Sequence, residues 1–267
     1  MRDLKFDPIE RFYRELKDVD STKRTFETEM EGRDVVEIKN KGLLYYIIKE
    51  VKQLFPNGIK CALNAGGDLG IDLILMKENG ISIKEAFSID IFTPENHSSD
   101  FPKYVEGSIY NLDLLFVGKK FDLILLKEVI EHLFDPDLAI SNLKSVIEKD
   151  GILILTTPNL SSLINRILLL FGFTPISYEV STKFTFGRPK KYNFRSGAAG
   201  HIRLFTFKAI IDFLKFYGFE VKKAYTISTP PSDFVSKENF IIRIDRLFSK
   251  LNKRWGSNLI IVCKLRT

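Results

Sequence analysis

Cysteine is nearly absent from this sequence, which has only Cys61 and Cys263 among its 267 residues. Each lies inside a short apolar run of the kind that forms a buried strand. We therefore interpret both as small core residues rather than as a disulfide or a pair of metal ligands. Because a protein without disulfides suits a reducing compartment, we expect a cytoplasmic location.

Long apolar runs are also missing. The longest, Leu163 to Phe173, is interrupted by Asn165 and Arg166, and it is too short to cross a bilayer, which takes about 20 apolar residues. The N-terminus is charged from its first residues and lacks the apolar core of a secretory signal. We expect no transmembrane segment.

Acidic residues are absent from one long stretch. Residues 180–211 contain no Asp or Glu, although the whole chain has 34 acidic and 40 basic residues. The basic residues of this stretch are Lys183, Arg188, Lys190, Lys191, Arg195, Arg203 and Lys208. A solvated surface explains many such runs. Because aromatic residues lie between the charges, this run also suits an anionic ligand or surface.

Strand and helix patterns alternate along the rest of the chain. Apolar runs predict strands at residues 59–65, 86–91, 121–126, 151–156, 219–227 and 259–264. Helical spacing of apolar residues predicts helices at 42–55, 71–78, 137–149 and 206–217. Such alternation indicates a mostly parallel sheet with helices on both faces. We predict a Rossmann-like, doubly wound α/β domain at 56–267, preceded by a helical N-terminal extension at 1–55.

A glycine-rich turn joins the first predicted strand to the helix that follows it, at residues 64–70 (NAGGDLG). Glycines let the backbone approach a ligand, and a helix N-terminus offers N–H donors. The second strand ends at Asp90, about 20 residues further on, where a carboxylate can accept both hydroxyls of a ribose. A tight turn and a solvated carboxylate would explain each feature alone, but their spacing favours nucleoside binding.

Several later blocks are more specific: FDLILL at 121–126, EVIEHLFDP at 128–136, GILILTTPN at 151–159 and GHIRLFT at 200–206. Together they resemble class I S-adenosylmethionine-dependent methyltransferases, most closely the branch that includes the ubiquinone-pathway O-methyltransferases. The resemblance covers about residues 59–264. It implies a seven-stranded sheet with the last strand antiparallel, S-adenosylmethionine as methyl donor, and cofactor contacts from Gly66, Gly70 and Asp90.

Three positions depart from the pattern of that family. Many members have an acidic residue at the position of Asn64, a glycine at that of Asp68 and an acidic adenine contact at that of Ser108. The resemblance assigns Asn64 and Ser108 to cofactor binding. Asn64 can still form hydrogen bonds, but it cannot neutralise a positive charge, and Asp68 puts a side chain where backbone should approach the cofactor. A silent binding module that kept the fold is therefore an alternative.

Glu128, Glu131 and His132 follow one another at i, i+3 and i+4, which predicts one face of a helix. Two carboxylates and an imidazole so placed can hold a divalent cation, with His201 as a candidate fourth ligand. The arrangement is similar to the metal-binding face of ubiquinone-pathway and small-RNA 2′-O-methyltransferases. Helix capping and packing would explain the same residues without a metal. Without a metal, His132 or His201 would serve as a general base toward a substrate hydroxyl, and Glu128 is a further catalytic candidate.

Residues 160–203 make a connection too long for a simple turn, and insertions of this length are often lids or binding loops. The segment 163–172 resembles the lid helix of methyltransferases found in polysaccharide and lipid-linked sugar pathways. Its apolar face would pack on the domain or lie on a membrane surface or lipid chain. We expect O-methylation of a small or glycan-like, anionic acceptor. A nucleic-acid methyltransferase is the alternative that the basic run favours, although no known RNA- or DNA-binding motif is present.

Overall fold

The computed structural model describes residues 42–67, 70–91, 100–189, 199–228 and 240–266. These residues fall into two compact units. The first unit comprises residues 42–127, 134–154 and 263–266, and the second comprises 128–133 and 155–262. Most of the predicted N-terminal extension, the residue Asp68 and the basic residues Lys190, Lys191 and Arg195 lie outside the described residues.

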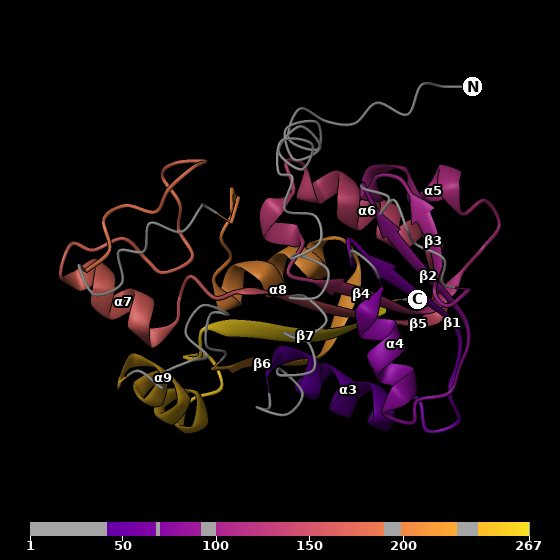
Figure 1. The fold of residues 1–267 in the computed structure, drawn as a ribbon, viewed down its shortest axis with the longest axis horizontal. Helices are drawn as coiled ribbons and strands as arrows, with labels where there is room; N and C mark the ends of the chain where they lie inside the picture. Colours follow the sequence, from indigo (N-terminus) through magenta and orange to yellow (C-terminus); the bar gives the residue numbers. More distant parts are fainter. Residues whose placement is uncertain (1–41, 68–69, 92–99, 190–198, 229–239, 267) are drawn as a thin grey trace. The chain divides into compact units, whose positions relative to one another are not determined.

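The described strands form one seven-stranded sheet in the order β3-β2-β1-β4-β5-β7-β6, with the last strand antiparallel and the others parallel (Figure 1). The strands are β1 (Ile59–Ala65), β2 (Ile83–Asp90), β3 (Lys103–Glu106), β4 (Phe121–Lys127), β5 (Ile147–Pro158), β6 (Phe219–Ile227) and β7 (Asn258–Leu265). Leu63 of β1 pairs with Phe87 of β2 on one side and with Ile124 of β4 on the other. The strand order therefore reverses at β1, which confirms the predicted Rossmann-like fold.

Three of the described helices begin at residues whose side chains cap them. The described helices are α3 (Leu43–Leu54), α4 (Ile71–Glu78), α5 (Leu112–Leu115), α6 (Pro136–Val146), α7 (Leu163–Leu170), α8 (Phe207–Phe216) and α9 (Phe240–Leu251), with 3₁₀ turns η1 (Ile109–Asn111) and η2 (Ile130–His132). Asp135, Ser162 and Thr206 cap α6, α7 and α8 by accepting a backbone N–H of the first turn, which stabilises a helix by about 1 kcal/mol. Helix α6 ends earlier than predicted, because Ile147 already has an extended backbone (φ −77°, ψ 143°) and begins β5.

The core of the first unit lies around β1, whose side chains are buried except at Lys60. Phe87, Phe116 and Phe121 meet edge to face with ring centroids 5.1–5.8 Å apart, the geometry that aromatic quadrupoles favour. Cys61 and Cys263 are both buried and unbridged, as predicted for core residues. Among the described residues, no helix combines the length and the apolar character that crossing a bilayer requires.

Candidate functional site

The glycine-rich turn of the first unit lies directly beside the end of β2. The backbone N–H of Gly66 donates to the carbonyl of Ile89 over 2.8 Å. The carbonyl of the next residue, Asp90, accepts the N–H of Gly107 over 2.9 Å. These two bonds fix the half-buried Asp90 next to the turn. Both lie at the carboxyl ends of the strands, beside the point where the strand order reverses. Ligands of open α/β sheets bind at such a place.

At Gly67 and Gly70 the turn has no room for a side chain. Gly66 and Gly70 have φ values of 77° and 71°, which L-residues with a side chain rarely adopt. A Cβ atom added at Gly70 would lie 2.3 Å from Cγ of Pro102, and one at Gly67 would lie 1.9 Å from Nδ2 of Asn64. The turn therefore offers backbone that a ligand can approach closely.

Asn64 is fully buried behind this turn. Its Nδ2 lies 3.5 Å from the carbonyl of Gly67 and 3.5 Å from Oδ2 of Asp72. Its Oδ1 is buried and has no hydrogen-bond partner among the described residues. Because buried acceptors are nearly always paired, this oxygen fits the amino group of a ligand.

The structure adds an ion pair that the sequence analysis missed. Lys127, at the end of β4, pairs with the buried Asp72 of α4 over 2.6 Å. Asp72 thus brings a carboxylate next to the neutral Asn64, and Lys127 offsets its charge. The lysine that directly follows the apolar residues 123–126 at the end of β4 was the available signal.

Ser108 is buried, and its hydroxyl accepts the N–H of Tyr110 over 3.2 Å to cap η1. It directly follows Gly107, whose N–H binds the carbonyl of Asp90. The cofactor-binding roles assigned to Asn64, Ser108 and Asp90 stay predictions.

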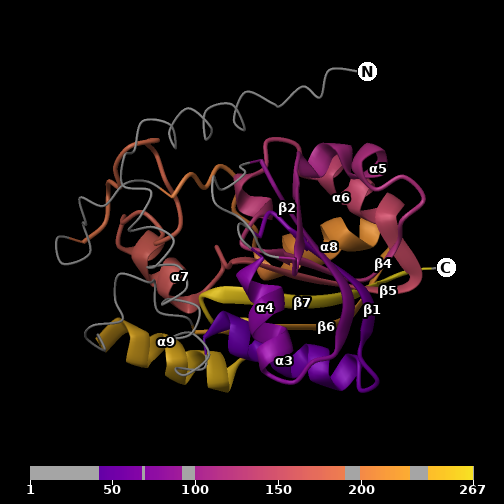
Figure 2. The same ribbon diagram turned by 45° about the vertical axis from the view of Figure 1, so that its right-hand side comes forward.

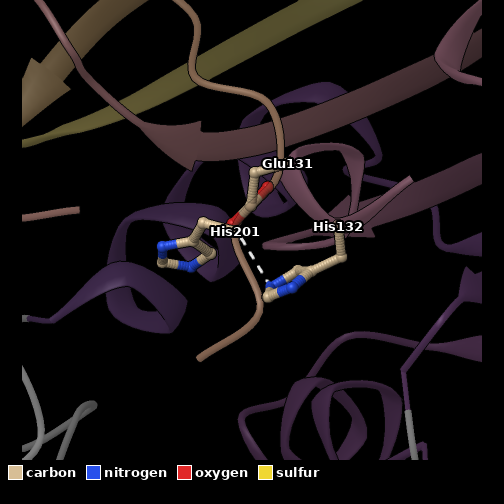
Figure 3. Close-up of side chains that lie close together, drawn as sticks. All are labelled: Glu131, His132 and His201. Carbon is tan, nitrogen blue, oxygen red and sulfur yellow. Dashed lines mark ion pairs between the residues drawn. The ribbon is translucent and has the colours of Figure 1, made fainter. Parts of the chain in front are cut away.

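In the second unit, three side chains point toward one another: Glu131 and His132 from η2, and His201 from a distant loop (Figure 3). One potential ligand atom from each can be chosen so that all lie within 4.8 Å of one another. Nε2 of His132 lies 4.0 Å from Oε1 of Glu131. The loop is held in place because the backbone N–H groups of Ile202 and Arg203 both donate to the carbonyl of Glu131 over 3.0 Å.

Backbone carbonyls fix the tautomers of both imidazoles. Nδ1 of His132 lies 3.2 Å from the carbonyl of Gly200, and Nδ1 of His201 lies 3.0 Å from that of Ser177. Since a carbonyl only accepts, Nδ1 is the donor, and in the neutral ring Nε2 carries the lone pair. Burial, followed by the nearby His201, lowers the pKa of His132 to about 4. Burial also lowers the pKa of His201, against the opposing effect of Glu179.

The carboxyl group of Glu131 is fully buried. Its Oε2 accepts the hydroxyl of Thr157 over 2.9 Å, whereas Oε1 has no hydrogen-bond partner within the described part of the chain. Burial, followed by the nearby Glu128, raises the pKa of Glu131 well above its usual range. A buried carboxylate is costly unless a proton or a cation compensates its charge. The cluster therefore fits a divalent cation held by one carboxylate and two imidazoles.

Glu128 does not share a helix face with Glu131 and His132, so that prediction is wrong. Only Ile130–His132 is helical, and Glu128 lies before this turn with a φ of +54°. Its N–H donates to the backbone and hydroxyl oxygens of Thr156, and Nδ2 of Asn258 donates to its Oε2 over 3.2 Å. The three-residue cluster at His201 does not include Glu128.

Several residues of the basic run bind their own chain. The guanidinium of Arg188 donates to the carbonyl of Ile176, and burial lowers its pKa. Nε of Arg203 donates to the carbonyl of Leu133 over 3.2 Å, and Lys208 pairs with Asp212. Capture of an anionic acceptor by Arg188 stays a prediction.

Comparison with known proteins gives a family match and a set of similar folds. A family model described as a methyltransferase domain matches residues 40–224. No curated protein matches the sequence significantly.

Three solved structures illustrate the fold. An S-adenosylmethionine-dependent methyltransferase from Clostridium acetobutylicum has a TM-score of 0.58 at 12% identity, covering 91% of this chain and 100% of that chain. A Haloferax volcanii methyltransferase in complex with its activator Trm112 has a TM-score of 0.56 at 12% identity, covering 88% and 95%. A Burkholderia thailandensis 1,6-didemethyltoxoflavin N1-methyltransferase, bound to its substrate and S-adenosylhomocysteine, has a TM-score of 0.52 at 11% identity, covering 93% and 92%. At these identities the likeness concerns the fold.

Proposed function

The chain belongs to the methyltransferase-domain family, and on this premise we propose that it transfers a methyl group from S-adenosylmethionine to an oxygen of a small or glycan-like, anionic acceptor. The observation that carries the proposal is the bond from the N–H of Gly66 to the carbonyl of Ile89, which holds the glycine-rich turn against the end of β2. The ubiquinone-pathway or glycan branch stays a prediction.

The first unit offers groups that suit each part of this cofactor. Gly66 and Gly70 would let backbone approach its methionine part, and Oδ1 of Asn64 would accept from its amino group. Asp90 would accept the ribose hydroxyls, and Ser108 would lie near the adenine. The bound cofactor supplies a methyl group already activated on a sulfonium. The contribution of the chain is therefore positioning rather than a covalent intermediate.

The second unit would hold a divalent cation on Glu131, His132 and His201, and the cation would orient oxygens of the acceptor. The lowered pKa values of both imidazoles support this, because neutral imidazoles are the metal-binding form. Without a cation, a ring with a pKa of about 4 is a weak base at neutral pH.

A second candidate function is a binding module that kept the fold without activity. It is favoured by the neutral Asn64 and by the Lys127–Asp72 pair beside it, which place no net negative charge near the positively charged end of the cofactor.

Titration calorimetry with S-adenosylmethionine tests the proposal. Asp90→Ala should weaken binding by about ten- to a hundredfold, because a lost charge-assisted contact costs about 1.5–3 kcal/mol. Asp113→Ala removes an exposed carboxylate from α5 of the same unit and should bind like the parent. If Asp90→Ala binds as tightly as the parent, the site is misplaced. A parent that does not bind millimolar cofactor would favour the silent module.

A further inference from the structure

The lid of the second unit exposes large apolar side chains. At the C-terminal end of α7, Leu169, Leu170 and Phe171 are 55%, 80% and 70% exposed. The buried face of this helix includes the polar Asn165. Further exposed apolar side chains follow in the connection: Phe173, Tyr178, Val180, Phe184 and Phe186. Apolar side chains in such number mark an interaction surface rather than an ordinary solvated loop.

Helix α9 lies next to this part of the second unit and also exposes apolar side chains. It contacts α7, and the two helices lie side by side in both views (Figures 1 and 2). Leu247 and Leu251 of α9 are exposed as well. We call residues 169–186 together with Leu247 and Leu251 the lid surface.

Internal hydrogen bonds brace the lid. Nδ2 of Asn165 donates to the carbonyl of Asn159 over 3.0 Å, and its Oδ1 accepts the N–H of Ile176 over 2.9 Å. The N–H of Thr174 donates to the carbonyl of Gly187 over 2.8 Å. The segment that carries the exposed apolar side chains is therefore held in a defined conformation by its own hydrogen bonds.

The described charges within and beside the lid surface are mostly basic. Residues 160–189 contain three basic residues, Arg166, Lys183 and Arg188, and one acidic residue, Glu179. The carboxylate of Glu179 accepts three backbone N–H groups, those of residues 199, 200 and 201, so it is directed into its own loop. Arg166 on α7 and Lys183 beside Phe184 are exposed.

We propose that the lid surface docks on an anionic membrane, with Leu169, Leu170 and Phe171 among the lipid headgroups and Arg166 and Lys183 near their phosphates. Apolar side chains flanked by basic ones are the chemistry by which peripheral proteins bind anionic bilayers. The sign of the charge selects such a surface over a neutral one. This inference goes beyond methyl transfer and does not depend on it.

Co-sedimentation of the full chain with vesicles tests the proposal. The parent should bind phosphatidylcholine vesicles that contain phosphatidylglycerol and bind pure phosphatidylcholine much less. The triple variant L169S/L170S/F171S should bind the anionic vesicles at least about tenfold more weakly. The matched control L114S/V117S/F216S removes apolar side chains that are also exposed but lie outside the lid surface, and it should bind like the parent.

Three results would overturn the proposal: a parent that does not sediment with anionic vesicles, equal binding to both kinds of vesicle, or equal binding of parent and lid variant. A parent dimer that the lid variant converts to monomers, without vesicle binding, would assign the surface to a second copy of the chain. If the triple variant does not fold, Leu170→Trp provides an independent readout, with Phe216→Trp as its control. Tryptophan at 170 should shift to shorter emission wavelengths on anionic vesicles and be quenched by brominated lipid, and an unchanged spectrum would overturn the proposal.

Discussion

The two candidate sites are built from different materials. In the first unit, the site is centred on backbone: a glycine-rich turn held to β2 by the bond from Gly66 to Ile89. In the second unit, it is a set of buried side chains, Glu131, His132 and His201, aligned by backbone carbonyls. Ligand affinity at a backbone turn depends mainly on shape, whereas ligand affinity at a cluster of buried ionisable groups depends mainly on charge.

Each site nevertheless contains one buried oxygen without a hydrogen-bond partner among the described residues, Oδ1 of Asn64 and Oε1 of Glu131. The first belongs to a neutral amide, which a hydrogen-bond donor alone would satisfy. The second belongs to a carboxyl group whose pKa is raised, so a proton or a cation is needed to compensate its charge. The comparison therefore predicts that ion binding belongs to the second unit and cofactor binding to the first.

The largest effect should come from Glu131→Gln, which keeps the shape and removes the charge. The parent should bind about one Mn²⁺ or Zn²⁺ ion, more tightly as pH rises, because the carboxyl group must lose its proton. The variant should bind the ion about a hundredfold more weakly or not at all, measured by metal analysis after dialysis.

Asp245→Asn is the matched control for this loss. Asp245 is also a buried acid of the second unit, burial raises its pKa, and its Oδ1 likewise has no partner among the described residues. It lies outside the cluster at His201, so its variant should retain the ion. Equal ion content in parent and Glu131→Gln would remove the metal from the proposal.

A smaller effect is expected from Gly70→Ala, which tests whether the first site depends on shape. The substitution adds strain of about 1–2 kcal/mol at a positive φ and a Cβ 2.3 Å from Pro102. Gly80→Ala has a similar φ of +85°, but its Cβ would have no neighbour within 4 Å. Both variants should lose stability in denaturant unfolding, Gly70→Ala more, and only Gly70→Ala should lose cofactor affinity by calorimetry. Equal affinity in the two variants would mean that no ligand approaches the turn.

The difference between a site formed by one local turn and a site formed by distant side chains also explains which features the sequence could predict. The glycine turn, β1 and α4 follow from local signals, and their predicted bounds at 59–65 and 71–78 match the structure. Strand β3 was missed because KYVE is short and at most half-buried, so it lacks an apolar run. Its strand conformation is seen only in its pairing with β2, which no local pattern reveals. Helix α9 was missed as well, although FIIRIDRLFSKL places apolar residues at helical spacing and so carried a usable signal.

The side-chain cluster was only partly predictable. The sequence predicted Glu131 and His132 as neighbouring candidate ligands, and the block GHIRLFT indicated His201 as another. The position of Glu128 was not readable, because the φ of +54° is held by Thr156, a residue 28 positions away in the chain. Likewise, the tautomers of the imidazoles depend on carbonyls of Gly200 and Ser177, which no local pattern reveals.

The smallest effect should come from Asn64→Asp, which gives the first site a charge like that of the second. A carboxylate would replace the unpaired Oδ1 and attract the amino group of the cofactor, since charge-assisted hydrogen bonds are roughly twice as strong as neutral ones. Asp72, 3.5 Å from Nδ2 of Asn64, would oppose the new charge, but Lys127 already pairs with Asp72 over 2.6 Å and offsets much of the repulsion. We therefore expect a gain of about three- to tenfold in cofactor affinity, or about 0.6–1.4 kcal/mol, by calorimetry. Asn57→Asp makes the same change at an exposed turn of the first unit and should leave the affinity unaltered. A weaker-binding Asn64→Asp would mean that Oδ1 faces an acceptor or an apolar group, and the amide would then have to be assigned to packing rather than to the cofactor.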